Sequence, residues 1–169
     1  NVVYSLIGDV IEKATGRSYK ELVEERLLRP LHMRRTSLGW EAWRDDGNRA
    51  SPHVCQRGRF FPIGDSKSYY ALLPAAGINA SIRDMAVWLQ ALMAARPDAI
   101  PCSVVERISR PEVATPGERR RFSWRGRVKA ASYGLGWRIF QYSGEEMIFH
   151  KEKLLQIGGM RTQGEKKWK

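Results

Sequence analysis

The chain has 169 residues, of which 43% are hydrophobic and 28% charged, and this composition is typical of a globular domain and too apolar for a disordered chain. The longest uncharged run, 68–82, contains Pro74 and Gly77, so we expect no membrane span, and Cys55 and Cys102 are too few for a disulfide framework. The formal net charge of +11, from 29 Lys and Arg against 18 Asp and Glu, is the unusual feature.

The first segment predicts an amphipathic helix. Apolar residues recur at steps of three and four positions, at Val3, Leu6, Ile7, Val10, Ile11 and Ala14. Gly16 then predicts the C-terminal cap, because glycine adopts the left-handed conformation without a Cβ clash. We therefore expect a helix with one apolar face over 3–14.

Two further helices are predicted by their capping residues. Ser18 and Glu21 have the spacing of a capping box, and the helix that they begin ends at Arg29-Pro30. Ser81 and Asp84 repeat that pattern before an apolar stripe of Met85, Trp88, Leu89, Leu92 and Met93, which ends at Arg96-Pro97. Pro101 favours the start of a short fourth helix.

The remaining segments predict strands and loops. Residues 39–76 scatter aromatic side chains among Gly, Pro, Asp and Arg, which indicates loops and short strands. From Tyr133 to Ile139 the apolar period becomes two, which predicts a strand, and Ser143-Gly144 predicts a hairpin turn before a return strand over 147–149. Helices followed by an antiparallel hairpin indicate mixed α and β structure, not a doubly wound sheet.

The basic residues gather in the last third of the chain. Positions 118–169 hold 13 basic and 5 acidic residues. Arg119–Arg121, Arg125, Arg127 and Lys129 surround Phe122 and Trp124, and aromatic rings among cations can stack on nucleic-acid bases. The stretch has no recognisable nucleic-acid motif, so we interpret it as a solvated loop and do not expect a nucleic-acid partner.

No self-contained catalytic or metal motif is present in the sequence. His32, His53 and His150 have no ligand spacing, and His53 with Cys55 lacks the second pair that zinc requires. Gly134-Leu135-Gly136 is not followed by the helix of a dinucleotide site. No serine is followed three positions later by lysine, and Gly-x-Ser-x-Gly is absent. We therefore expect no metal and no cofactor.

Four segments, taken in order, resemble the serine β-lactamase-related family, which comprises class C β-lactamases, D-alanyl-D-alanine peptidases and esterases. They are the helix ending in Thr15-Gly16, the segment Pro30-Leu31-His32-Met33 with Thr36-Ser37, the run Pro74–Gly77 leading into Ser81–Ala86, and Tyr133–Trp137. The resemblance covers about residues 1–150.

The resemblance implies an α+β, partial β-lactamase/transpeptidase-like fold, with helices packed on an antiparallel sheet and the N-terminal part missing. It implies a domain over 1–150 and a basic tail over 151–169 that departs from the family pattern. We expect helices that pack on a complete sheet in the family to expose apolar faces here.

The resemblance also implies the chemistry. The family acylates the serine of Ser-x-x-Lys, assisted by Tyr-x-Asn and by Lys-Thr-Gly or His-x-Gly. Asn1 matches the asparagine of Tyr-x-Asn, and His150 falls at the position of His-x-Gly, although Lys151 and Glu152 follow it. The serine, the lysine and the tyrosine would precede residue 1, as in a truncated or frameshifted gene.

We therefore expect a fragment of an acyl hydrolase for β-lactam, D-Ala peptide or ester substrates, without turnover of its own. The alternatives are a non-catalytic binding or scaffold protein of the same fold and, third, a basic nucleic-acid-binding protein. The compartment and the oligomeric state stay open.

Overall fold

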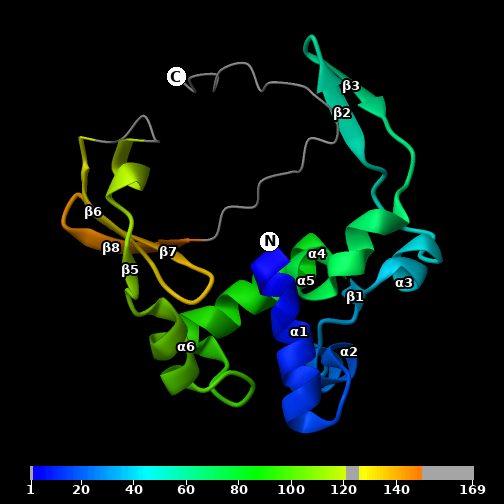
Figure 1. Cartoon of the computed structure of the whole chain (residues 1–169), viewed down its shortest axis with the longest axis horizontal. Helices are drawn as coiled ribbons and strands as arrows, with labels where there is room; N and C mark the ends of the chain where they lie inside the picture. Colours follow the sequence, from blue (N-terminus) through cyan, green and yellow to red (C-terminus); the bar gives the residue numbers. More distant parts are fainter. Residues whose placement is uncertain (1, 121–125, 150–169) are drawn as a thin grey trace.

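The computed structural model describes residues 2–120 and 126–149, which form short helices and three small antiparallel sheets (Figure 1). The helices are α1 (Val2–Thr15), α2 (Tyr19–Val23), α3 (Trp40–Arg44), α4 (Leu73–Ala76), α5 (Ile82–Gln90) and α6 (Cys102–Ser109). The strands are β1 (Ser37–Leu38), β2 (His53–Gln56), β3 (Arg59–Pro62), β4 (Ile78–Asn79), β5 (Val113–Ala114), β6 (Val128–Tyr133), β7 (Arg138–Tyr142) and β8 (Glu145–Phe149). The α+β class expected from the sequence is confirmed.

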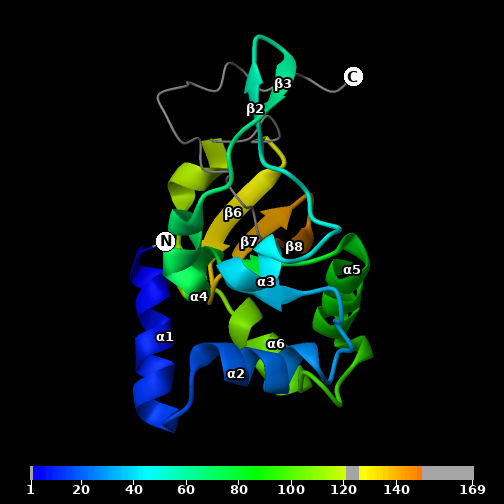
Figure 2. The ribbon, with the colours of Figure 1, turned by 90° about the vertical axis from the view of Figure 1, so that its right-hand side faces the viewer.

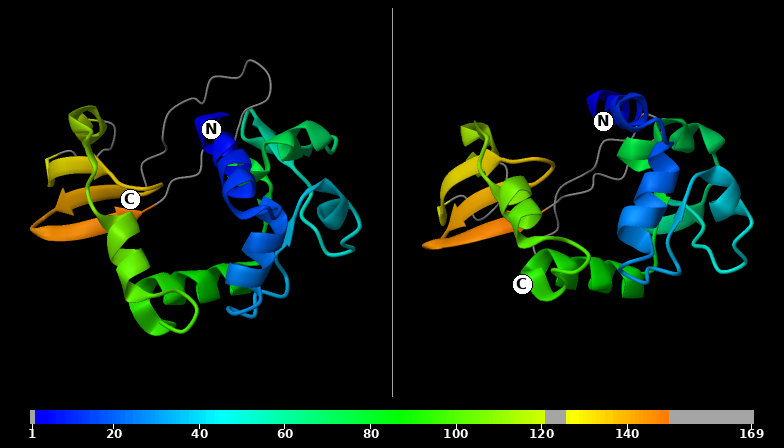
Figure 3. Two further views of the ribbon diagram at one scale, coloured as in Figure 1. Left: turned by 60° about the horizontal axis from the view of Figure 1, so that its bottom comes forward. Right: turned by 90° about the horizontal axis from the view of Figure 1, so that it is seen from below.

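The chain follows a horseshoe path. The four-stranded sheet, in the order β5-β6-β7-β8, lies at one end, and α1 with α2 lies at the other (Figure 3). α5 and α6 connect the two ends, while the β2–β3 hairpin extends away from them (Figure 2). In the described ranges, none of the helices is long and apolar enough to span a membrane.

The predicted helix boundaries are confirmed at their caps. Gly16 has a φ of +68° and donates its N–H to the Glu12 carbonyl at 2.9 Å. The Ser18 hydroxyl accepts the Glu21 N–H at 3.2 Å while the Glu21 carboxylate accepts the Ser18 N–H, which completes the capping box. α2 continues through a π-helical turn over Glu24–Leu28 before Pro30 ends it.

Asp84 does more than cap α5. Its N–H donates a hydrogen bond to the Ser81 hydroxyl oxygen at 3.1 Å, as the sequence predicts. Its side chain is 4% exposed, and the Oδ2 atom accepts both the Arg35 N–H at 2.8 Å and the Thr36 hydroxyl at 2.7 Å. The carboxylate therefore joins α5 to the segment that leads into β1.

Two apolar clusters form the core. The first contains Leu31, Met33, Ala91 and Ile100, packed by residues of α5 such as Val87 and Trp88. The second, in the sheet, contains Val128, Ala131 and Phe140. The predicted apolar stripe runs from α5 into a π-helical turn over Ala91–Ala95, and it is divided. Trp88 and Leu92 pack on the first cluster, whereas Met85, Leu89 and Met93 are exposed. This exposure agrees with the expectation of uncovered apolar faces.

The predicted strand over 133–139 is wrong. Tyr133 ends β6, residues 134–137 form a turn, and Arg138 begins β7. The two glycines that alternate with apolar residues in this segment are required by the turn. Gly134 packs against the end of α6, where a Cβ would lie 2.7 Å from the Ile108 carbonyl oxygen, and Gly136 has a φ of +89°. The following turn is as predicted, with Ser143 and Gly144 both at positive φ.

Residues 39–76 contain loops and the short strands β2 and β3, as expected, but they also form α3, a 3₁₀ helix over Lys67–Leu72 and α4, none of which was predicted. Trp40 and Trp43 on α3 pack with Tyr70, with ring centroids 5.2 to 6.1 Å apart. The Arg49 guanidinium lies 5.0 Å from the Trp43 ring. The five residues of α3 carry too little periodicity to indicate a helix, and this aromatic cluster stabilises it.

We predict that Asp84→Ala lowers the free energy of unfolding by about 3 kcal/mol, because the Arg35 N–H and the Thr36 hydroxyl lose a charged acceptor in a buried place. Asp84→Asn keeps one oxygen acceptor and should cost about 1 kcal/mol. Urea denaturation followed by tryptophan fluorescence measures both. Equal stability of the alanine variant and the wild type would contradict the prediction.

We predict that Gly134→Ala lowers the free energy of unfolding by about 2 kcal/mol, because its methyl group would meet the carbonyl oxygens of Ile108 and Arg110 within 3 Å. The control is Gly117→Ala, since a Cβ at Gly117 meets nothing within 4 Å. We expect the control to change stability by less than about 0.5 kcal/mol. Similar losses in both variants would show that the close approach at Gly134 is unimportant.

Candidate functional site

The first turn of α1 meets the end of β6. The Tyr4 hydroxyl donates to the Tyr133 hydroxyl at 3.4 Å, a contact between residues 129 positions apart in sequence. This hydrogen bond links α1 to the end of β6. The start of α1 therefore lies beside the end of the sheet that contains the Gly134–Trp137 turn.

A row of paired residues continues from Tyr133 across the sheet. Tyr133 is opposite Arg138 on β7, and Arg138 is opposite Phe149 at the end of β8. The Arg138 guanidinium lies 5.8 Å from the Tyr133 ring and 3.4 Å from the Glu118 carboxylate, and both charged side chains are about one-fifth exposed. The C-terminal end of β8 therefore lies at the same end of the sheet as Tyr133.

Asn1 and His150, the two site residues expected from the sequence, lie outside the described residues. Their chain neighbours are described. Val2, which follows Asn1, begins α1, and Phe149, which precedes His150, ends β8. The Tyr4–Tyr133 contact and the row from Tyr133 to Phe149 bring the first turn of α1 and the end of β8 to one side of the described structure.

The environment of Tyr4 keeps its phenol protonated. The hydrogen bond with Tyr133, followed by burial, raises the pKa of Tyr4 to about 12. The phenol is therefore neutral over the physiological range, so it serves as a hydrogen-bonding group at this junction and not as a proton-accepting phenolate. The sequence pattern does not single out Tyr4. The one signal that could have found it is its position three residues after Asn1.

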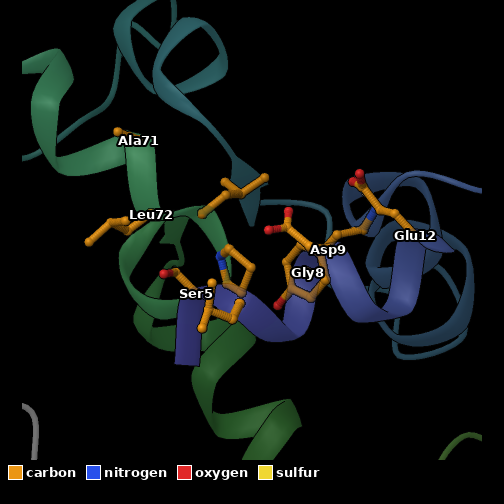
Figure 4. Close-up of a pocket in the computed structure, with 10 residues that line it drawn as sticks. Ser5, Gly8, Asp9, Glu12, Ala71 and Leu72 are labelled. Carbon is orange, nitrogen blue, oxygen red and sulfur yellow. Dashed lines mark hydrogen bonds between the residues drawn. The ribbon is translucent and has the colours of Figure 1, made fainter. Parts of the chain in front are cut away.

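A hollow of about 320 Å³ lies between α1 and the segment Ala71–Pro74 (Figure 4). Ser5, Asp9 and Glu12 line it from α1, and Leu72 and Pro74 line the other wall. The Glu12 carboxylate already accepts the Tyr19 N–H at 2.9 Å. We interpret the hollow as the seam along which α1 packs on α4, not as a ligand site.

The other candidate groups are spread over the described part of the chain. His53 lies on the β2–β3 hairpin, where its Nδ1 is 2.8 Å from the Ser51 carbonyl oxygen, and Cys55 and Cys102 are free and exposed. Between residues 2 and 149, with 121–125 left aside, no group of three or more His, Cys, Asp or Glu could hold a metal ion.

Two relatives have names that refer to D-amino acids. The chain is 28% identical over 153 residues to a D-aminopeptidase of Brucella anthropi, a match that covers 87% of this chain and 25% of that protein. It is 28% identical over 92 residues to the D-alanyl-D-alanine-carboxypeptidase/endopeptidase AmpH of Escherichia coli, with 53% and 21% covered. The chain therefore spans about a quarter of the length of these relatives.

Solved structures show the same fold. The octameric penicillin-binding protein homologue from Pyrococcus abyssi superposes with a TM-score of 0.70 at 24% identity, over 86% of this chain and 30% of that one. A D-stereospecific amidohydrolase from Streptomyces gives 0.61 at 21% identity, over 87% and 40%. These likenesses confirm the penicillin-binding-protein-like fold.

The family model described as Beta-lactamase matches residues 1–163, which is nearly the whole chain. This match covers all four segments on which the sequence resemblance rests. The chain belongs to the β-lactamase family of serine acyl hydrolases.

Proposed function

We propose that this chain is part of a serine acyl hydrolase whose substrates are amides or peptides of D-amino acids. The observation that carries the proposal is the family match over residues 1–163 together with the names of the relatives. The names of a D-aminopeptidase, a D-alanyl-D-alanine-carboxypeptidase/endopeptidase and a D-stereospecific amidohydrolase all refer to the D configuration. β-Lactams and simple esters are the other substrates that the family fold accommodates.

The reaction that we propose for the complete domain proceeds through an acyl-enzyme. The serine oxygen of Ser-x-x-Lys attacks the carbonyl carbon, and the tetrahedral oxyanion is stabilised by backbone N–H donors. The C–N bond then breaks, and the amine leaves with the proton that the serine lost. Water attacks the ester, which releases the acid and restores the serine.

In this scheme Asn1 and His150 each supply a polar group to the substrate. Asn1 would hydrogen-bond the acyl part of the substrate from the start of α1, and His150 would do so from the end of β8. What supports these roles is the arrangement of their chain neighbours, because the Tyr4–Tyr133 contact and the row ending at Phe149 lie at one junction.

We further propose that the 169-residue chain alone does not turn over substrate. Support comes from the sequence, in which no serine is followed three positions later by lysine. Without the nucleophile and its proton acceptor, no acyl-enzyme can form by the family route. The second candidate function, a non-catalytic binding protein of the same fold, rests on the same absence.

Hydrolysis assays test this proposal. We expect the purified chain to give no saturable hydrolysis of D-alanine p-nitroanilide, a chromogenic cephalosporin or a nitrophenyl ester, read by absorbance. Saturable hydrolysis that co-purifies with the chain and is lost in His150→Ala would sink the proposal of inactivity. The control for background is the same assay on heat-denatured protein.

Stoichiometric binding of D-alanine p-nitroanilide without turnover would favour the binding protein over the hydrolase part. Isothermal titration calorimetry measures this binding, with L-alanine p-nitroanilide as the matched control ligand. Equal heats for the two enantiomers would contradict recognition of the D-configuration.

A further inference from the structure

The β2–β3 hairpin exposes apolar side chains on both of its faces. Residues that lie opposite each other in an antiparallel pair share a face, and successive residues along a strand alternate between faces. Phe60 lies opposite Cys55 on one face, and Phe61 lies opposite Val54 on the other. Phe60 is 74% exposed and Phe61 is 45% exposed. The body of the protein, from which the hairpin extends, therefore covers neither ring (Figure 2).

The apolar residues of β3 belong to an uninterrupted exposed run. Phe60, Phe61, Pro62 and Ile63 follow one another in sequence, and all four are exposed. Such a run is unfavourable in water unless it serves a contact, and a two-stranded hairpin without further packing is only marginally stable in water. The run therefore favours a binding partner that removes both faces of the hairpin from water at once.

The tip of the hairpin is cationic. Arg57 and Gly58 form the turn with φ values of +48° and +79°, and Arg59 follows as the first residue of β3. Positive φ at both positions of a two-residue turn normally selects Asn-Gly or Asp-Gly, so arginine is unusual in the first of them. Residues 47–64 contain no Asp or Glu, so the positive charge of the hairpin is not offset within this segment.

We propose that the β2–β3 hairpin binds the surface of an anionic lipid bilayer, with Phe60 and Phe61 in the headgroup region and Arg57 and Arg59 against the lipid phosphates. A flat protein surface covers one face of a hairpin, whereas the bilayer interface takes up apolar side chains from both faces. Phosphates complement the two guanidinium groups, and each basic residue near an anionic bilayer strengthens the attraction. This contact is separate from the proposed hydrolase chemistry and does not depend on it.

Vesicle co-sedimentation of the full 169-residue chain tests the proposal. We expect binding to vesicles of phosphatidylcholine and phosphatidylglycerol in a ratio of about three to one, and binding about tenfold weaker or less to phosphatidylcholine alone. Arg57→Gln with Arg59→Gln should weaken binding to the anionic vesicles about thirtyfold, because two cations leave the interface. Phe60→Ser with Phe61→Ser should weaken it at least about tenfold, because the apolar contact is lost.

A matched control separates the hairpin from the overall charge of the chain. Arg83→Gln with Arg110→Gln removes the same charge from two exposed positions, on α5 and at the end of α6. We expect this variant to bind the anionic vesicles within about threefold of the wild type, because its hairpin is unchanged. Far-ultraviolet circular dichroism of all variants confirms that they retain the fold.

The two cysteines report which part of the chain meets the bilayer. Both are free and exposed, and Cys55 lies on β2 whereas Cys102 begins α6. An environment-sensitive fluorophore on Cys55, in a Cys102→Ser background, should shift its emission to shorter wavelength on anionic vesicles, because lipid replaces the water around it. The same fluorophore on Cys102, in a Cys55→Ser background, should keep its emission.

Three results would overturn the proposal. The first is equal binding of the hairpin arginine variant and its matched control, since the net charge alone would then hold the chain on the vesicles. The second is an emission shift at Cys102 without one at Cys55. The third is retention on single-stranded DNA or on an acidic polypeptide that requires Arg57 and Arg59 while the anionic vesicles are not bound, which would assign the hairpin to another class of partner.

Discussion

The buried carboxylate of Asp84 is the contact on which the helical part of this chain depends. Among the described residues it is the only charged side chain that is buried. It binds the backbone of Arg35 and the hydroxyl of Thr36 and thereby holds the segment before β1 against α5. That segment leads into β1, which pairs with β4, at Ser37 with Asn79 and Leu38 with Ile78. Burial of this carboxylate is tolerated because the Arg35 N–H and the Thr36 hydroxyl both donate hydrogen bonds to it.

From this junction the chain builds two ends that meet at the candidate site. α5 packs against the first apolar cluster through Val87 and Trp88, and the chain continues through α6 to the sheet, where Gly134 allows the β6–β7 turn to approach the end of α6 closely. The position of this turn then determines where Tyr133 lies, and the Tyr133 hydroxyl accepts a hydrogen bond from Tyr4 of α1. The spacing between the start of α1 and the end of β8 therefore depends on contacts far from either, including a glycine that cannot be replaced without moving backbone.

Much of the fold could be predicted from local patterns, whereas the site could be predicted only through the family resemblance. Ser18 with Glu21 and Ser81 with Asp84 mark helix starts because capping involves residues close in sequence. The turn at Ser143-Gly144 could also be predicted, because a hairpin turn depends on residues that are adjacent in sequence. The segment 133–139 was misinterpreted because a tight turn between two strands keeps the alternation of a single strand, and only the docking of Gly134 on α6 distinguishes the two.

The sequence by itself determined the helices α1, α2, α5 and α6, the caps at Gly16, Ser18 and Ser81, the hairpin turn at Ser143-Gly144 and the family, because each depends on residue types at short spacing or in a fixed order. Only the tertiary structure decided that Asp84 binds Arg35 and Thr36, which lie 49 and 48 positions before it in sequence, that Tyr4 meets Tyr133, and that α1 turns its apolar face outward. Amphipathicity specifies that a helix has an apolar face, but which way that face points is set by what the opposite side contacts. For α1 those contacts are Pro74, Tyr19 and Tyr133.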